Sequence, residues 1–408
     1  MTALPELALD FIRGACSMLP DHAFAVRLWD GTLIEPEAHQ PRFTMVLRHP
    51  EVFAKFMASS DWRTLGEAYL RDEIDIEGDI EQVYPVAEYL QESFGTALAE
   101  RGGGVGLSPF ASDDPEAHTK ERDAEAIEYH YDMGNEAFSK ILDVTQNYSS
   151  AYYHRPDSTL EEAQRNKVHR ICRKVGLRGG DRVLDIGCGW GAVLSHVAGE
   201  YDATITGVTI SKAQAEFCRA RMLREGKEAR AQVEICDYRD IDERQTFDKI
   251  ISLGMVEHVG VKNLRTYFDK AFRLLRPGGV FGLQGVSSSV SEATTEAIAF
   301  TKSYLFPDAD MPYLAQYIQA ASEAGFEVRD VENLREHYAW THRAWRHNLE
   351  ANEAAVIAEI GRERYRALRV LFSYSTHYFL KIKCSVYQFV LWKPAGDRPA
   401  DLPLKREL

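Results

Sequence analysis

A short apolar run that ends in three alternating glycines is the strongest chemical signal in the chain. Residues 182–187 read RVLDIG, and Gly187, Gly189 and Gly191 follow at every second position. Glycine lets the backbone turn sharply and lie against a ligand. A dinucleotide site would require G-x-G-x-x-G, and Asp185 would repel its pyrophosphate. The carboxylate suits a cationic amine better, although a turn that needs glycine only for its shape is the simpler alternative.

This glycine turn lies in a segment where predicted strands and helices alternate. Ser158 to Glu161 reads S-x-x-E, a helix-capping pattern, and apolar residues recur at helical spacing from Val168 to Val175. RPGG at 276–279 is a turn signal. Strands are predicted at 182–187, 203–210, 233–237, 248–254, 280–286, 326–332 and 385–392. Strands separated by helices indicate an α/β fold with a doubly wound, Rossmann-like sheet.

Composition divides the chain further. Residues 1–92 mix helical and alternating patterns, which suits a small N-terminal α+β domain. Residues 93–122 are rich in glycine and then in charge, as in a flexible linker. Residues 123–408 carry the alternation, interrupted at 291–375 by a mostly helical stretch that we interpret as a cap over the site. The basic, aromatic residues 361–383 could meet anionic lipid headgroups, line a tunnel for the acyl chain, or form a solvated helix face with its apolar side in the core.

Charge and composition argue against several kinds of partner. The 408 residues carry a net charge of −14, which disfavours nucleic acid. The N-terminus lacks the basic region of a signal peptide, and no apolar stretch is long enough to span a bilayer. Six scattered cysteines form no C-x-x-C pair and no zinc-type cluster with histidine. We therefore expect a cytoplasmic protein with reduced thiols and no metal.

Eight motifs in order resemble the cyclopropane-fatty-acyl-phospholipid synthase family, a branch of the class I S-adenosylmethionine methyltransferases. They are GEAYLRDEIDIEGD (66–79), HYDMGNEAF (130–138), YSSAYY (148–153), VLDIGCGWG (183–191), GVTISKAQ (207–214), CDYRD (236–240), MVEHVG (255–260) and HYAWTHRAW (337–345). The motifs cover nearly the whole chain, and HYDMGNEAF and the EHVG run are specific. The resemblance implies a C-methyltransferase that uses S-adenosylmethionine on phospholipid acyl chains, as a homodimer peripheral to the inner face of the membrane.

The resemblance also implies the cofactor-binding residues. Asp185, Gly187 and Gly189 would line the methionine end of S-adenosylmethionine, and Tyr131, Tyr148 and Ser149 would touch the cofactor. These six residues come from the VLDIGCGWG, HYDMGNEAF and YSSAYY motifs.

Two further pairs follow the next strands. Thr209 and Gln214 stand where the family usually has an acidic residue for the ribose hydroxyls, and both can hydrogen-bond a diol. Asp237 and Tyr238 stand where the family recognises adenine. Two alternatives stay open, because Ser211 to Gln214 is also a helix-capping pattern and Asp237 could be a helix N-cap.

The implied reaction explains the remaining residue types. An alkene is a poor nucleophile, so it must be held against the sulfonium methyl in a dry pocket. Methyl transfer leaves a carbocation, which the faces of Tyr131, Tyr148, Tyr152 and Tyr338 could stabilise, although each could also be an ordinary core aromatic. Glu257, after the fourth strand, is the carboxylate best placed to remove a proton.

Relatives that close a cyclopropane ring hold a bicarbonate ion with a cysteine, a glutamate, a histidine and a tyrosine. Glu257 and Tyr338 match this set, but Ser150 replaces the cysteine and Gln284 the histidine. Glutamine brings no positive charge to an anion, so we expect a weakened bicarbonate site and a methyl-branched unsaturated product, with a cyclopropane as the alternative. His258 could support the site residues from behind or simply be a residue at a helix N-terminus, and we favour the latter.

Two rivals come from other functional classes. A small-molecule N-methyltransferase needs little more than a positioned amine, but the N-terminal domain and the EHVG setting of Glu257 disfavour it. A non-catalytic protein that binds lipid or cofactor would take up S-adenosylmethionine without consuming it.

Overall fold

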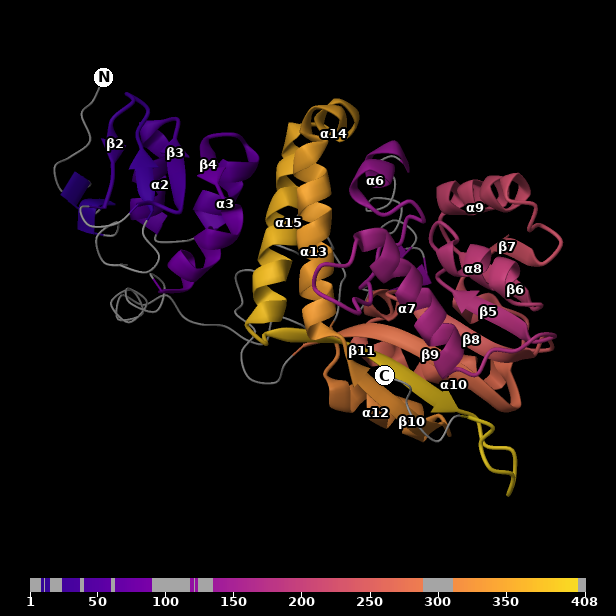
Figure 1. Cartoon of the computed structure of the whole chain (residues 1–408). Helices are drawn as coiled ribbons and strands as arrows, with labels where there is room; N and C mark the ends of the chain where they lie inside the picture. The colour runs from indigo at the N-terminus through magenta and orange to yellow at the C-terminus, as the bar shows by residue number, and fades with distance from the viewer. Residues whose placement is uncertain are drawn as a thin grey trace.

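Two β-sheets organise the chain (Figure 1). The computed structural model describes residues 9–10, 12–14, 24–36, 40–59, 63–89, 118–120, 122–123, 135–288 and 311–402. Within these residues a four-stranded sheet lies near the N-terminus and a seven-stranded sheet lies in the remainder of the chain, with long helices between them.

The large sheet has the strand order β10-β11-β9-β8-β5-β6-β7. Its strands are β5 (Arg182–Ile186), β6 (Thr204–Thr209), β7 (Ala231–Ile235), β8 (Phe247–Leu253), β9 (Leu275–Ser288), β10 (Glu327–Asn333) and β11 (Cys384–Trp392). The strands from β9 to β7 are parallel, and only β11 runs antiparallel to its neighbours. The predicted α/β class with a doubly wound sheet is confirmed.

Helices cover both faces of this sheet because its strands are apolar on both sides. One face packs on α7 (Leu160–Lys174), α8 (Ala192–Glu200) and α9 (Lys212–Arg224), and the other on α10 (Leu264–Leu274) and α12 (Leu314–Glu323). Successive side chains of a strand point to opposite faces. Accordingly Val183 packs in the cluster on the side of α7, α8 and α9, whereas Leu184 and Ile186 pack in the cluster on the side of α10 and α12.

Two local predictions need correction. The helix α7 is capped by Thr159 and Glu162, one residue later than the predicted pair Ser158 and Glu161, because hydroxyl and carboxylate pairs occur in both registers. The predicted turn at 276–279 is part of β9, where the pairing with β8 shifts register. Its glycines therefore shape a bulge in a strand.

The small sheet has the order β2-β1-β3-β4. The elements here are β1 (Ala25–Arg27), β2 (Leu33–Ile34), β3 (Phe43–Leu47), α2 (Pro50–Ser59), α3 (Arg63–Leu70), β4 (Ile74–Gly78) and the short η1 (Ile80–Gln82). The buried residues of the small sheet and of the neighbouring helices form one apolar cluster, which includes both Phe43 and Trp345.

These neighbouring helices are α6 (Asn135–Ile141), α13 (Arg335–Ala351), α14 (Glu353–Ile360) and α15 (Arg362–Leu380). In Figure 1, α13 and α15 stand side by side between the two sheets. Ion pairs join them to the segments on either side of β4: Arg346 to Glu81 in η1 at 3.0 Å and Arg366 to Asp72, before β4, at 3.0 Å. Both arginines are buried, so these pairs tie the two parts of the chain together.

Parts of the predicted linker and cap differ from the structure. Residues 93–117 lie outside the described residues, but His118, expected in an exposed linker, is only 5% exposed and its Nδ1 lies 3.1 Å from the carbonyl oxygen of His258. Within the described residues of the predicted cap, α12 and β10 belong to the sheet layers, whereas the helices from α13 onward stand apart from the sheet. The domain boundaries remain a prediction.

Candidate active site

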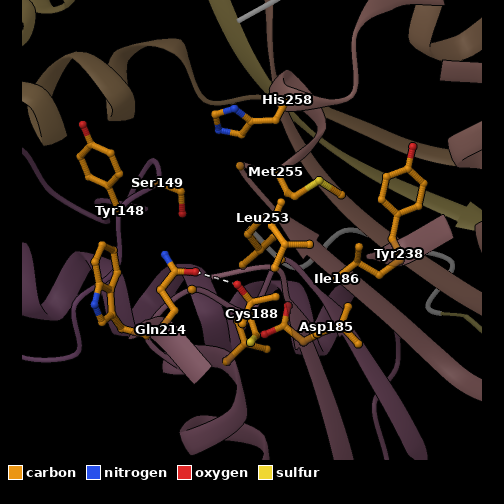
Figure 2. Close-up of a pocket in the computed structure, with 18 of the residues that line it drawn as sticks. Tyr148, Ser149, Asp185, Ile186, Cys188, Gln214, Tyr238, Leu253, Met255 and His258 are labelled. Carbon is orange, nitrogen blue, oxygen red and sulfur yellow. Dashed lines mark hydrogen bonds between the residues drawn. The ribbon is translucent and has the colours of Figure 1, made fainter. Parts of the chain in front are cut away.

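A pocket opens where β5, β6, β7 and β8 end, at the carboxyl edge of the large sheet (Figure 2). All the predicted cofactor residues line it: Tyr148, Ser149, Asp185, Gly187, Gly189, Thr209, Gln214, Asp237 and Tyr238. Parallel strands bring their carboxyl ends to one edge, so residues from separate motifs meet there.

The glycine turn forms the floor of this pocket. Gly187, Gly189 and Gly191 have φ values of 81°, 51° and 81°, which side chains rarely allow. A Cβ on Gly187 would lie 2.6 Å from Met255 Cγ, whereas one on Gly189 would meet nothing within 4 Å. Gly187 N donates to the carbonyl of Val208 at 3.0 Å, which ties the turn to β6. The turn thus needs glycine both for its conformation and for its close approach.

Asp185 and Lys167 are both buried behind the turn. Asp185 is 2% exposed, and its Oδ2 has no hydrogen-bond partner among the described residues. Burial raises the pKa of Asp185, and the positive charge of Lys167 opposes that rise. Lys167 Nζ donates to Asn147 Oδ1 at 2.8 Å and to Ser149 Oγ at 2.9 Å. The unpartnered carboxylate oxygen is therefore suited to receive a ligand ammonium.

Lys167 was not singled out from the sequence. It is fully buried, and it occupies the same face of α7 as Val168 and Ile171, so a lysine at an apolar position of the helix was the available signal. Gln164, one turn earlier, is also buried and donates to the carbonyl of Ser149 at 2.9 Å. These two side chains hold the backbone and side chains of the YSSAYY segment against the pocket.

Thr209 and Gln214 hydrogen-bond each other inside the pocket wall. Thr209 Oγ1 donates to Gln214 Oε1 at 2.8 Å, which leaves the amide nitrogen to provide donors. Ser211 caps α9 by accepting from Gln214 N at 3.2 Å, so the capping alternative is also correct for the backbone. Gln214 serves the cap through its backbone while its side chain lines the pocket.

Asp237 binds Arg239, two residues further along the chain. It caps the short helix η2 (Tyr238–Asp240) by accepting from Arg239 N at 2.8 Å, and its Oδ2 lies 2.6 Å from Arg239 Nη2. Burial opposes ionisation of Asp237, but the hydrogen bonds from Arg239 outweigh it and lower its pKa. Arg239 also binds Asp123 at 2.8 Å. The N-cap alternative is therefore realised, and the carboxylate has little capacity left for a ligand.

Glu257 lies behind the pocket wall in the short helix η3 (Val256–His258). Its Oε1 accepts from Val286 N at 2.7 Å, and its buried Oε2 has no partner among the described residues. Burial raises the pKa of Glu257 to about 7. Met255 and His258 line the pocket. His258 is the last residue of η3, so the favoured prediction of a helix N-terminal position is wrong, and its place beside Glu257 fits the other predicted role. Burial lowers the pKa of His258 to about 4, which keeps its ring neutral at pH 7.

Ser150 and Gln284 lie next to each other, but their polar groups are used within the protein. Gln284 Nε2 donates to the carbonyl of Ser150 at 3.3 Å, and its Oε1 accepts from Gln388 Nε2 at 3.0 Å. Ser150 Oγ donates to the carbonyl of Ala151 at 3.2 Å. Both side chains are buried with no positive charge of their own. This arrangement does not fit a bicarbonate ion.

The candidate aromatic residues have different surroundings. Tyr338 on α13 borders the same apolar cluster as Val286, whose N–H binds Glu257. One face of the Tyr152 ring is covered by the guanidinium of Arg170, 4.4 Å from the ring centroid, so that face is not free for a carbocation. Tyr131 lies outside the described residues.

Comparison with known proteins decides the family. A profile of the family described as mycolic acid cyclopropane synthetase matches residues 118–389. The chain belongs to this family. A second profile, for a domain of unknown function, matches residues 11–97.

Similarity to individual proteins supports membership in the cyclopropane synthetase family. The chain is 35% identical to a probable fatty acid methyltransferase of Pseudomonas putida, over 94% of this chain and 95% of that protein. It is 40% identical to the cyclopropane-fatty-acyl-phospholipid synthase of Escherichia coli strain K12, over 53% of this chain and 54% of that one. The crystal structure of mycolic acid cyclopropane synthase CmaA1 with SAH and CTAB superposes with a TM-score of 0.63 at 31% identity, covering 66% of this chain and 98% of that chain.

Membership confirms three predictions: the family, the enzyme class and the cofactor. The protein is an S-adenosylmethionine-dependent methyltransferase of the cyclopropane synthetase family. The pocket fits that cofactor, because a buried carboxylate oxygen, a glycine turn and neutral hydrogen-bonding side chains face one cavity. Among the described residues no helix combines the length and apolar character needed to cross a bilayer.

Proposed function

We propose that the protein transfers the methyl carbon of S-adenosylmethionine to the double bond of an unsaturated fatty-acyl chain of a membrane phospholipid, and that the product is a methyl-branched unsaturated chain. The observation that carries this proposal is Glu257, a buried carboxylate beside the pocket with a raised pKa and an unpartnered oxygen. A base of this kind is what the reaction needs after the methyl group has been added.

The pocket residues hold and orient the cofactor, which supplies an electrophilic methyl group when bound. Asp185 Oδ2 would receive its ammonium group, and the backbone of Gly187 and Gly189 would lie against its methionine portion. Thr209 and Gln214 would hydrogen-bond its ribose. Tyr238 would contact its adenine, and Asp237 would contribute mainly by positioning Arg239. Tyr148 and Ser149 close the methionine side, and Lys167 holds Ser149 in place.

Glu257 then completes the reaction. Transfer of the methyl group that the bound cofactor would supply would leave a cation on the neighbouring carbon of the acyl chain. The faces of Tyr338, and of Tyr131 and Tyr148, stabilise this cation. Oε2 of Glu257 takes a proton from an adjacent chain carbon, and the electrons of that C–H bond form the new double bond. The proton later leaves the carboxyl group to solvent.

Ring closure is the second candidate, since the relatives from Escherichia coli and the CmaA1 structure are named cyclopropane synthases. It would require the proton to leave from the added methyl group. The hydrogen bonds that engage Ser150 and Gln284 favour the branched product, because these two positions lack the groups that hold an anion in ring-closing members. The name of the Pseudomonas putida relative, which matches over nearly its full length, also supports methylation.

The proposal includes where the enzyme works. We expect a homodimer that docks on the inner face of the membrane, with residues 1–92 forming a separate N-terminal domain. The profile match over residues 11–97 supports that division.

A deuterium count tests the product. The purified protein is incubated with unsaturated phospholipid vesicles and cofactor that carries a fully deuterated methyl group, and the released fatty acids are analysed by mass spectrometry. We expect three retained deuteriums, because the proton leaves from the chain. Two would indicate a cyclopropane or an exocyclic methylene. No label in any lipid would reject the lipid substrate and favour the N-methyltransferase or binding-only alternatives.

A further inference from the structure

The turn between α15 and β11 exposes apolar side chains in a fixed conformation. Leu380 is 43% exposed and Ile382 is 62% exposed. Ile382 has φ of 60°, a conformation that β-branched residues rarely adopt. The turn is nevertheless well anchored, because Ile382 N donates to the carbonyl of Phe379 at 3.2 Å and Arg335 Nη1 donates to the same carbonyl at 2.7 Å. The two apolar side chains are thus presented to solvent by a rigid turn.

A third exposed apolar side chain belongs to the same region. Glu88 contacts His377 at 3.1 Å and Lys381 at 3.8 Å, which brings the adjacent Tyr89, 40% exposed, to the end of α15. Seven large apolar residues are exposed within the described part of the chain. Three of them therefore gather at this one place, and a gathering of this kind marks an interaction surface.

Basic residues accompany these apolar side chains. Lys381 and Lys383 alternate with Leu380 and Ile382 in the turn, in a protein with a net charge of −14. Alternating lysine and aliphatic residues suit a bilayer surface, because the aliphatic groups enter the acyl region while the ammonium groups stay at anionic headgroups. An acidic protein would otherwise be repelled from such a surface.

The turn also lies close to the reaction site. An apolar cluster beneath it contains Phe379 and is bordered by Tyr338 and Val286, and the ring centroids of Phe379 and Tyr338 are 4.8 Å apart. Val286 N binds Glu257. In Figure 1 this region is found where the lower end of α15 meets β11, at the start of the large sheet. The apolar cluster beneath the exposed turn therefore borders the strand whose backbone binds the carboxylate.

We propose that the turn 380–383, together with Tyr89, inserts into the surface of an anionic phospholipid bilayer and sets the end of the molecule from which an acyl chain approaches Glu257. This inference rests on the proposed function for its substrate, but the insertion itself can be measured without turnover.

The test compares the full-length protein, the double variant Leu380→Asp/Ile382→Asp and a control, Leu223→Asp. Leu223 is 68% exposed on α9, which packs on β7 at the opposite edge of the sheet. Each protein is sedimented with vesicles of saturated phosphatidylglycerol and phosphatidylcholine, which contain no double bond. Cofactor affinity, measured by calorimetry, reports whether each variant is folded.

We expect the vesicle affinity of the double variant to fall at least about tenfold, because two aliphatic side chains can no longer partition into the bilayer. Its cofactor affinity should not change. The control should bind vesicles as the wild type does. Equal vesicle binding by the double variant and the wild type would overturn the inference, as would a wild type that does not bind vesicles. If the double variant also binds cofactor poorly, Ile382→Ser alone provides the comparison. Vesicle binding through this turn without labelled lipid product would reject the proposed function and leave the docking surface in place.

Discussion

Replacing Glu257 by glutamine should greatly slow product formation and yet stabilise the protein at alkaline pH. Burial raises the pKa of this carboxyl from 4.5 to about 7, so the folded protein binds this proton more tightly than the unfolded chain does. That contribution to stability is fully present below pH 4.5 and is lost as the pH rises through 7. Each tenfold change in proton affinity corresponds to about 1.4 kcal/mol, so the ionised carboxylate costs the folded state about 3 kcal/mol.

Glutamine removes this cost while its amide oxygen can still accept from Val286 N, the present partner of Glu257. The free energy of unfolding of Glu257→Gln, minus that of the wild type, should therefore increase by about 2 to 3 kcal/mol between pH 5 and pH 8.5. Urea denaturation at the two pH values measures this difference, and contributions of other groups cancel in it.

The methyltransferase activity of Glu257→Gln tests whether Glu257 is the base. Loss of a general base lowers a rate by roughly 10² to 10⁴-fold, and wild-type activity should fall as the pH drops through about 7. Cofactor affinity should not change, because Glu257 does not line the pocket. A stability difference that is independent of pH would refute the desolvation argument. Normal activity of Glu257→Gln would refute its role as the base.

Three other substitutions test the remaining parts of the site. Lys167→Met removes the donor that holds the Ser149 side chain and should weaken cofactor binding at least tenfold by calorimetry. It should also lower the free energy of unfolding by about 3 kcal/mol, because buried Asp185 loses the positive charge that opposes its rise in pKa. Affinity within twofold of the wild type would contradict this. Gly187→Ala should abolish cofactor binding and destabilise the fold by about 2 kcal/mol, whereas Gly180→Ala, which has a similar φ and open space around it, should cost only about 1 kcal/mol in urea denaturation. Ser150→Cys/Gln284→His should shift the deuterium count from three toward two and make the rate depend on bicarbonate; three deuteriums without bicarbonate dependence would show that these positions do not decide the product.

The order of strands and the glycine turn could be predicted because they depend on local patterns. Apolar runs bounded by glycine identified β5, β6 and β8 to within a residue or two, and the positions after them line the pocket. The helix start at Thr159 was missed by one residue, since neighbouring pairs satisfied the same capping pattern. A local pattern does not show which of two neighbouring pairs of hydroxyl and carboxylate residues caps the helix.

The partners of the site residues depended on tertiary structure. Asp237 had two possible roles in the sequence, and the position of Arg239 decided between them. Lys167 appeared as one more charged residue of a helix, until burial of that face set it beside Ser149.

The sequence by itself determined the fold class, the family and the residues around the cofactor pocket, because these are encoded in short motifs and in the period of apolar residues. Only the tertiary structure decided that Gln284 is bonded to both Ser150 and Gln388, and that Glu257 keeps one buried oxygen without a partner. Hydrogen bonding and desolvation depend on what surrounds a side chain, and those surroundings come from segments more than a hundred residues apart.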